Sequence, residues 1–329
     1  MSAGDLAPAG GLPGSDLNLG PDEGLNEPLE PQLGHEYDIA PVRGKHRRRE
    51  WVQLLLDALH YRRTQVGLAI FLFIVAVAVV GPYIAPHSPT EFVVAPYAKP
   101  SAIAKLGGDN LGRDVLSRAL CGGRSVLILS IIATAIGMIL GVSLGVVAGS
   151  ARAAIDEGIM RLLDVLLAFP SIVFVLLMVS VLGPRLWLIV LTVGITAAPR
   201  IARVVHGCTQ EVKERDFVVA AESLGVSRLK IAFTEILPNI SSPLMVEGGL
   251  RLTSSVAIIA SLSFLGFGLQ PPAADWGLMV NENRVGLIVQ PYSVFVPVAL
   301  IAILTIGVNL ATDGIAHAMI GIGRDTGSA

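Results

Sequence analysis

Six long apolar runs limit what this chain can fold into more than any other feature of its sequence. They cover about residues 66–85, 125–149, 160–182, 186–206, 246–268 and 293–314. Each is about as long as the roughly 20 residues that a helix needs to cross a hydrocarbon core of ~30 Å. Because charged residues make up only 15% of the chain, they could not cover a water-facing surface. The sequence therefore predicts an all-α integral membrane protein with six transmembrane helices.

The N-terminal residues have a different composition. Residues 1–42 are rich in Gly, Pro, Asp and Glu and contain no Lys or Arg, and residues 43–49 then read RGKHRRR. Such a segment cannot bury enough apolar surface to order itself. We expect a disordered tail over residues 1–49, either a tolerated extension or a regulatory segment, followed by a transmembrane domain over residues 50–329. Residues 50–61 have the apolar spacing of an interfacial helix or of a lead-in to the first span.

The Lys and Arg residues indicate the orientation, because they favour the cytoplasmic flanks of membrane spans. With the N-terminus in the cytoplasm, 17 of the 24 Lys and Arg residues fall in cytoplasmic segments or at cytoplasmic span ends. We therefore expect a multi-pass protein of the cell (plasma or inner) membrane with the tail and both termini in the cytoplasm. In this topology residues 207–245 form the longest cytoplasmic loop between two spans.

This loop contains the signals of two short helices. Asp216 or a neighbour can cap a helix over residues 217–224, and Gly225 suits a left-handed helix end. A second helix is expected over residues 228–236, ended at Pro238. Two short helices joined at a glycine form a compact projection. By composition alone the projection could also be an ordinary polar helix–turn–helix.

The spacing within the loop resembles the EAA loop of ABC importer permeases, which has the pattern E-A-A-x3-G-x9-I-x-L-P. The residues that match in register are Ala220, Ala221, Gly225, Leu237 and Pro238. Val219 stands where the family has its glutamate, and Glu222 can supply a charge nearby. Glu235 stands where the family has its isoleucine, with Ile236 one place on.

Four further stretches resemble the same subfamily, the dipeptide, oligopeptide and nickel permeases. They are GGDNLGRDVLSRAL (107–120), IMRLLDVLLAFPS (159–171), LSFLGFGLQPPAADWGLMV (262–280) and NLATDGIAHAM (309–319). The last stretch keeps only the Asn and the Asp-Gly core of the family's ending. The resemblance runs from about residue 60 to residue 320 and leaves out the tail.

The resemblance implies the fold of a type I ABC importer permease, which forms half of a transmembrane pathway, and we expect di- or oligopeptides as its cargo. It also implies several partners: a homologous second permease, two phosphate-loop ATPase subunits that bind ATP and Mg²⁺, an extracytoplasmic substrate-binding protein and a peptide substrate. The chain itself has no G-x-x-x-x-G-K-[ST] sequence, so we expect it to bind no cofactor. The implied ATPase-coupling residues are Phe217, Ala220, Ala221, Glu222, Gly225, Leu237 and Pro238.

Other functions remain as alternatives. The coupling motifs do not identify the cargo, so nickel, glutathione or another small solute is the alternative substrate. An ion-coupled secondary transporter would keep carboxylates near mid-membrane, whereas Asp164 and Asp313 lie near the inner ends of their runs. A membrane enzyme would need a nucleophile and a base that converge, and no such set stands out. The six histidines are scattered without metal-ligand spacing, so we expect neither a catalytic nor a metal site, and no nucleic-acid partner.

The second apolar run carries a regular series of glycines. Gly137, Gly141, Gly145 and Gly149 recur at every fourth residue. Such a face lets helix backbones approach closely, which is how membrane helices associate without a hydrophobic driving force. We expect a packing face, with a sliding surface for a conformational change as the alternative.

Three smaller features carry expectations of their own. Asp164 is expected to pair with Arg161, three residues before it, at the membrane interface. Trp276 suits an anchor at the level of the lipid headgroups, or a contact for a docked binding protein. Cys121 and Cys208 would lie near opposite faces of the bilayer and stay unpaired.

Overall fold

The described part of this computed structural model comprises Leu59 and residues 61–325, with side chains described as far as His317. All of these residues belong to one structural unit. The expected tail over residues 1–49 and most of the expected helix over residues 50–61 lie outside the described residues.

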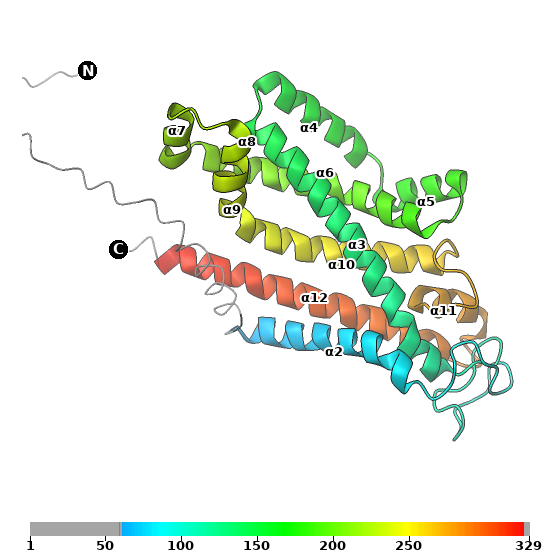
Figure 1. The fold of residues 1–329 in the computed structure, drawn as a ribbon. Coiled ribbons are helices and arrows are strands. Elements are labelled where there is room, and N and C mark those ends of the chain that lie inside the picture. Colours follow the sequence, from blue (N-terminus) through cyan, green and yellow to red (C-terminus); the bar gives the residue numbers. More distant parts are fainter. Residues whose placement is uncertain (1–58, 60, 326–329) are drawn as a thin grey trace, which may run out of the picture. The chain divides into compact units, whose positions relative to one another are not determined.

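The described chain is helical throughout, apart from its connections (Figure 1). Its elements are α2 (Arg62–Ile84), α3 (Val115–Ser150), α4 (Ala153–Leu167), α5 (Ser171–Leu182), α6 (Leu186–Lys213), α7 (Asp216–Ser223), α8 (Arg228–Ile231), the π-helical turn η1 (Ala232–Ile236), α9 (Leu237–Asn239), α10 (Ser241–Phe264), α11 (Trp276–Asn283), the 3₁₀ turn η2 (Arg284–Gly286) and α12 (Tyr292–Asp325). Within the described residues, β-structure is limited to two isolated bridges, Phe92 with Arg113 and Gly108 with Asp114.

Five described helices, α2, α3, α6, α10 and α12, are long and apolar enough to cross a membrane. The run at 160–182, expected to form one span, is divided between α4 and α5, which meet at a bend of 78°. The break falls at Pro170, which has extended backbone angles. Proline lacks the N–H that a helix interior requires and pushes the residue before it out of the helical region. The predicted span at 160–182 is therefore broken near Pro170, and α4 and α5 together remain a candidate for it.

Helix α3 starts ten residues earlier than the apolar run that predicts it. The Asp114 side chain caps the helix by accepting a hydrogen bond from the Ser117 N–H at 3.0 Å. Such a cap satisfies a backbone donor that the first turn leaves without a partner. The polar residues at the start of α3 are therefore helical and continue directly into the apolar run.

Helices α3 and α6 pack along much of their length through the glycine series. The four glycines Gly137, Gly141, Gly145 and Gly149 all face α6. A Cβ atom added to Gly141 would lie 2.5 Å from the Cβ atom of Ile201 and 2.8 Å from the carbonyl oxygen of Ala198. Real Cβ atoms do not approach other atoms so closely, so a side chain at this position would force the helices apart.

The same contacts give the relative direction of the two helices. Gly137 lies against Gly194, near the start of α6, and Gly149 lies against Thr209, near its end. Residue numbers therefore increase together along both helices, and α3 and α6 are parallel. The chain between them, α4 and α5, must return from the end of α3 to the start of α6.

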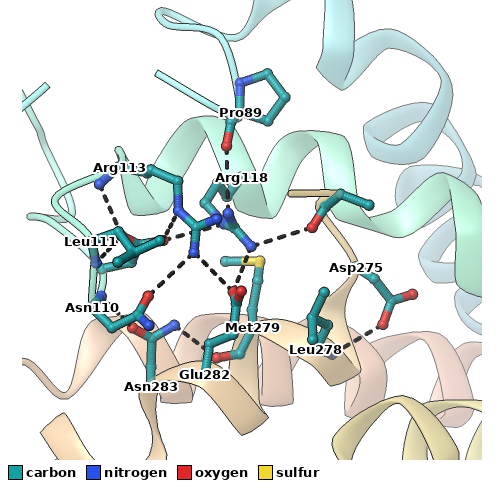
Figure 2. A network of polar contacts seen from close by, with 12 residues as sticks. Pro89, Asn110, Leu111, Arg113, Arg118, Asp275, Leu278, Met279, Glu282 and Asn283 are labelled. Carbon is teal, nitrogen blue, oxygen red and sulfur yellow. Dashed lines mark hydrogen bonds and ion pairs between the residues drawn. The ribbon is translucent and has the colours of Figure 1, made fainter. Parts of the chain in front are cut away.

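A buried cluster of charged side chains joins three parts of the chain at the end of α3 opposite to α7 (Figures 1 and 2). The Arg113 and Arg118 guanidinium groups both donate to the same oxygen of Glu282 in α11, at 3.0 Å and 2.7 Å. Both guanidinium groups also lie near Asp109, at 2.6 Å and 3.4 Å. Two cations and two anions are thus brought together out of water. Because an unpaired buried charge is costly, each member depends on the other three.

Trp276, expected at the headgroup level, is completely buried. Its indole N–H donates to the carbonyl oxygen of Ala119 at 2.8 Å, and its ring lies against Gly122 and Gly123 of α3. A buried indole N–H needs such an acceptor, and glycine leaves room for the ring. The expectation of an exposed anchor was wrong because the sequence does not show that α11 lies on these two glycines.

The neighbouring Asp275 caps α11. Its carboxylate accepts hydrogen bonds from the Leu278 N–H at 3.0 Å and from the Ser125 hydroxyl of α3 at 2.7 Å. Burial raises the pKa of the Asp275 carboxyl, although these hydrogen bonds act in the opposite direction. Asp275, Trp276 and Glu282 therefore hold α11 to α3 at three points.

We predict that Gly141→Ala destabilises the chain although alanine is the better helix former. The added Cβ overpacks the contact of α3 with α6, which typically costs about 1–3 kcal/mol. Gly158→Ala is the matched control, because Gly158 of α4 has open space around it. That variant should gain up to about 1 kcal/mol from helix propensity. Thermal unfolding in detergent measures both, and equal stability of the two variants would contradict the packing argument.

We also predict that Glu282→Gln strongly destabilises the chain. The change leaves two buried guanidinium groups with a single carboxylate, and breaking a buried ion pair in this way costs roughly 3–5 kcal/mol. Glu157→Gln removes an exposed carboxylate that pairs with Arg161, so it should leave stability nearly unchanged. The same unfolding measurement compares the two, and a Glu282→Gln variant as stable as the control would refute the role of the cluster.

Candidate functional site

The connection from α6 to α10 folds into a compact projection, residues 214–240, which we call the knob. It comprises α7, α8, η1 and α9 and lies at the end of the helix bundle where α3 and α6 finish (Figure 1). The expected loop over residues 207–245 is longer than the observed connection. Residues 207–213 belong to α6 and residues 241–245 to α10, because both helices continue past their apolar runs.

The turn in the knob is formed at Gly225, as the sequence predicts. Its φ angle is 78°, in the left-handed region that glycine adopts without strain. The Gly225 N–H donates to Glu222 at 2.9 Å and the Val226 N–H donates to Ala221 at 3.1 Å. These bonds satisfy carbonyl groups at the end of α7 in the manner of a glycine C-cap.

The flanking helices differ from expectation in two places. Asp216, expected before the first helix, is the first residue of α7, and Arg215 is at the N-cap. The second helix widens into the π-turn η1 and continues through Pro238 to Asn239, so the expectation that Pro238 ends it was wrong. Pro238 is the second residue of α9, which begins where the π-turn ends, and proline is tolerated in the first turn of a helix because its missing N–H is not needed there.

An apolar cluster holds the knob to the membrane helices. Its buried members are Ile201, Val205 and Val212 of α6 together with Val218, Ile231, Ile236 and Ile240 of the knob. Side chains of α3, including Val142 and Val146, pack against it. Full burial of one such side chain stabilises by roughly 1.5–3 kcal/mol. The knob is therefore mounted on the ends of α3 and α6 mainly by apolar contact.

The sequence-predicted coupling residues fall into two groups. Phe217, Ala220, Glu222 and Gly225 are exposed around the turn, and Ala221 is half-buried beside them. Leu237 and Pro238 are half-buried at the other end of the knob, where it joins α10. The turn thus presents small and apolar side chains outward, together with the carboxylate of Glu222. Val219, where the resembled family has glutamate, is also exposed.

Two polar contacts join α4 to α6 near the knob. The Arg203 guanidinium donates to Asp164, and His206 Nε2 lies 2.7 Å from an Asp156 carboxylate oxygen. The expected pair of Asp164 with Arg161 is wrong, because Arg161 pairs with Glu157 one turn before it. Sequence spacing indicates neighbours on one helix, whereas the partner of Asp164 comes from a different helix that packs alongside.

At the start of α10, Glu247 and Arg251 form a mostly buried pair, with 2.8 Å between the Arg251 Nε and a Glu247 oxygen. Further along, the Thr253 hydroxyl of α10 donates to Asn309 of α12 at 3.0 Å. Cys121 and Cys208 are both free thiols. Among the described residues, no group of three or more His, Cys, Asp or Glu side chains is placed to hold a metal ion.

Comparison with known proteins places this architecture in a family. Residues 141–320, which include the knob and most of the membrane helices, match the model of the binding-protein-dependent transport system inner membrane component. The chain belongs to this family. Residues 62–100 match a second model, the N-terminal transmembrane domain of oligopeptide transport permease C. The chain is therefore an ABC importer permease of the inner membrane.

Several relatives and one solved structure are similar to this permease. The glutathione transport system permease protein GsiD of Pectobacterium atrosepticum is 34% identical over 283 residues, covering 84% of this chain and 93% of the relative. The di/tripeptide transport system permease protein DppC of Pseudomonas aeruginosa is 34% identical over 270 residues, covering 79% and 88%. An inward-facing structure of the methionine transporter MetNI superposes with a TM-score of 0.50 at 21% identity, over 62% of this chain and 95% of that chain.

These similarities confirm the family suggested by the five sequence motifs. They also confirm the expectation of a transport subunit in place of an enzyme, because the relatives are named as permease components. The similarity to MetNI, at this level of identity, supports the type I permease fold alone.

We predict that Val218→Ala loosens the knob and that Val219→Ala does not. The two valines are neighbours in α7, but Val218 is 1% exposed and Val219 is 51% exposed. Truncating the buried one should cost about 1–3 kcal/mol at the contact with α6. Hydrogen–deuterium exchange of the α7 amides should accelerate only in Val218→Ala. Equal exchange in both variants would show that the apolar cluster does not hold the knob.

Proposed function

We propose that this permease forms half of the membrane pathway of an importer for di- or oligopeptides and receives the energy of ATP through the knob. The observation that carries the proposal is the knob itself. Its exposed turn at residues 217–225 stands clear of the bundle, while its buried side joins the ends of α3, α6 and α10. A force applied to the turn therefore acts on three membrane helices at once.

The proposed topology has six spans, with α4 and α5 together crossing as one broken span and both termini in the cytoplasm. The parallel direction of α3 and α6 supports this count. Because the chain must cross the membrane once between two parallel spans, the bent pair supplies that crossing. The knob then lies on the cytoplasmic side, which agrees with the bias of Lys and Arg toward that side.

The proposed partners are a homologous second permease, two phosphate-loop ATPase subunits and an extracytoplasmic substrate-binding protein. ATP and Mg²⁺ bind to the ATPase subunits, and the turn around Ala220, Ala221 and Gly225 docks on their surface. Closure of the ATPase pair moves the knob and favours one of two packings of the membrane helices. The exposed Val219 contributes an apolar contact where the family's glutamate would contribute a charge.

Peptides are the proposed substrate class because the relatives named above include permeases of di/tripeptide and glutathione systems. Glutathione is itself a tripeptide, so it is an alternative cargo within the peptide class. Nickel or another small solute is a second alternative, outside that class. The family assignment argues against the ion-coupled secondary transporter that the sequence left open.

We predict that Ala221→Arg abolishes substrate-stimulated ATP hydrolysis by the assembled complex while the chain still inserts and assembles. The long charged side chain would separate the turn from the ATPase surface, so that contacts between the two are lost. A loss of ~1.4 kcal/mol of contact free energy weakens docking about tenfold. Ala153→Arg, at the exposed start of α4, is the matched control.

Gly225→Pro should have the same effect as Ala221→Arg, since proline cannot adopt a φ angle of 78°.

The same reconstituted complex identifies the cargo. Hydrolysis and uptake are measured with labelled dipeptides, longer peptides, glutathione and nickel, and peptides are expected to stimulate the unmodified complex. Normal stimulation in Ala221→Arg would refute coupling through the knob. Stimulation by nickel alone would leave the knob intact as a coupling element and overturn only the peptide assignment.

A further inference from the structure

A groove of about 340 Å³ lies between the knob and the membrane helices. One wall consists of the last turns of α3 and the start of α4, including Val147 and Ile155. The other wall is the side of α8 and η1, including Leu229 and Phe233. None of residues 217–225 of the exposed turn lines the groove, although Leu237 at the other end of the knob does.

The apolar lining of this groove extends beyond the membrane helix. Leu229 and Phe233 are 71% and 68% exposed and, four residues apart, lie on one face of the helix. Val147 and Ile155 on the opposite wall are also more than half exposed. Contiguous apolar surface of this kind marks a site that something covers. The apolar run of α3 ends at residue 149, beside the groove, so we expect the hydrocarbon of a bilayer to meet the headgroups near this position.

Positive charge borders the groove. Arg228 is the charged residue in its lining, and Arg152 is exposed between Ala151 and Ile155, which also line it. Neither arginine forms an ion pair with another residue that the structure describes. A small adjoining cavity is lined by Arg228 together with one acid, Glu222, and a second cation, Lys213.

The acidic residues at the start of α4 do not neutralise these arginines. Asp156 faces His206 of α6, and Glu157 pairs with Arg161. The groove therefore combines an apolar channel with two guanidinium groups that form no ion pair with a carboxylate of residues 61–317. Guanidinium groups bind phosphate oxygens through paired N–H donors.

We propose that this groove binds an anionic phospholipid, with an acyl chain along the apolar walls and the phosphate at Arg228 and Arg152. The lipid contacts α3 and α4 on one side and the knob on the other. Its binding therefore stabilises the position of α8 relative to the membrane helices. The assignment depends on the membrane location of the chain and not on the transported solute or the ATPase partners.

The test uses the full-length chain in nanodiscs that contain a trace of photoactivatable phosphatidylglycerol or phosphatidylcholine. Cross-linked peptides are located by mass spectrometry. We expect phosphatidylglycerol to label the groove walls around Val147 and Phe233 more strongly than phosphatidylcholine does. Arg228→Gln should lower this labelling about fivefold, the effect of ~1 kcal/mol for one basic residue near a lipid surface.

Lys230→Gln is the matched control, because Lys230 is exposed on the same short helix but does not line the groove. Unchanged groove labelling in this variant supports a specific site. An equal fall in both variants would show a general effect of surface charge and overturn the proposal. Equal labelling of the groove by the two lipids in the unmodified chain would by itself overturn the proposal. Cross-links from the groove to another protein chain in the assembled complex, with no lipid label, would show a protein interface instead.

Discussion

The close approach of α3 and α6 is the contact on which the rest of the structure depends. Four glycines on α3 remove the side chains that would otherwise separate the two backbones, so that Gly141 meets Ile201 and Ala198 directly. In lipid there is no hydrophobic gain from joining two apolar helices, and association rests on close packing of this kind. The two helices run parallel and end together beneath the knob. They connect the end of the bundle that contains the buried charge cluster to the end that carries the knob.

The two ends are held by different interactions. At one end, Arg113, Arg118 and Glu282 are part of a buried charge cluster in which no member can be removed without leaving a charge unpaired. That end is consequently fixed in one arrangement. At the other end, the knob is held by apolar contacts such as Val218 against α6, which have no directional requirement. Small shifts of the knob relative to α3 and α6 are therefore less costly than shifts within the charge cluster, which is compatible with the coupling role proposed for the knob.

Much of the site was predictable from local sequence because its determinants are local. The position of the knob follows from the polar interval between two apolar runs, and Gly225 has the left-handed conformation that its place after a short helix predicts. The bend at Pro170 and the continuation past Pro238 were not predicted, although both involve proline. Whether a proline ends, bends or starts a helix depends on the packing around it, which sequence does not contain.

By itself the sequence determined that the chain is a membrane protein, which motifs it shares with importer permeases, and where its projecting segment lies. These properties rest on hydropathy, residue spacing and backbone preferences, each acting over a few residues. Only the tertiary structure decided that Trp276 is buried on the glycines of α3 and that Asp164 pairs with Arg203. It alone brought Glu282 to two arginines more than 160 residues away. Contacts of this kind depend on which helices pack together, and a single sequence does not show which helix a given helix face packs against.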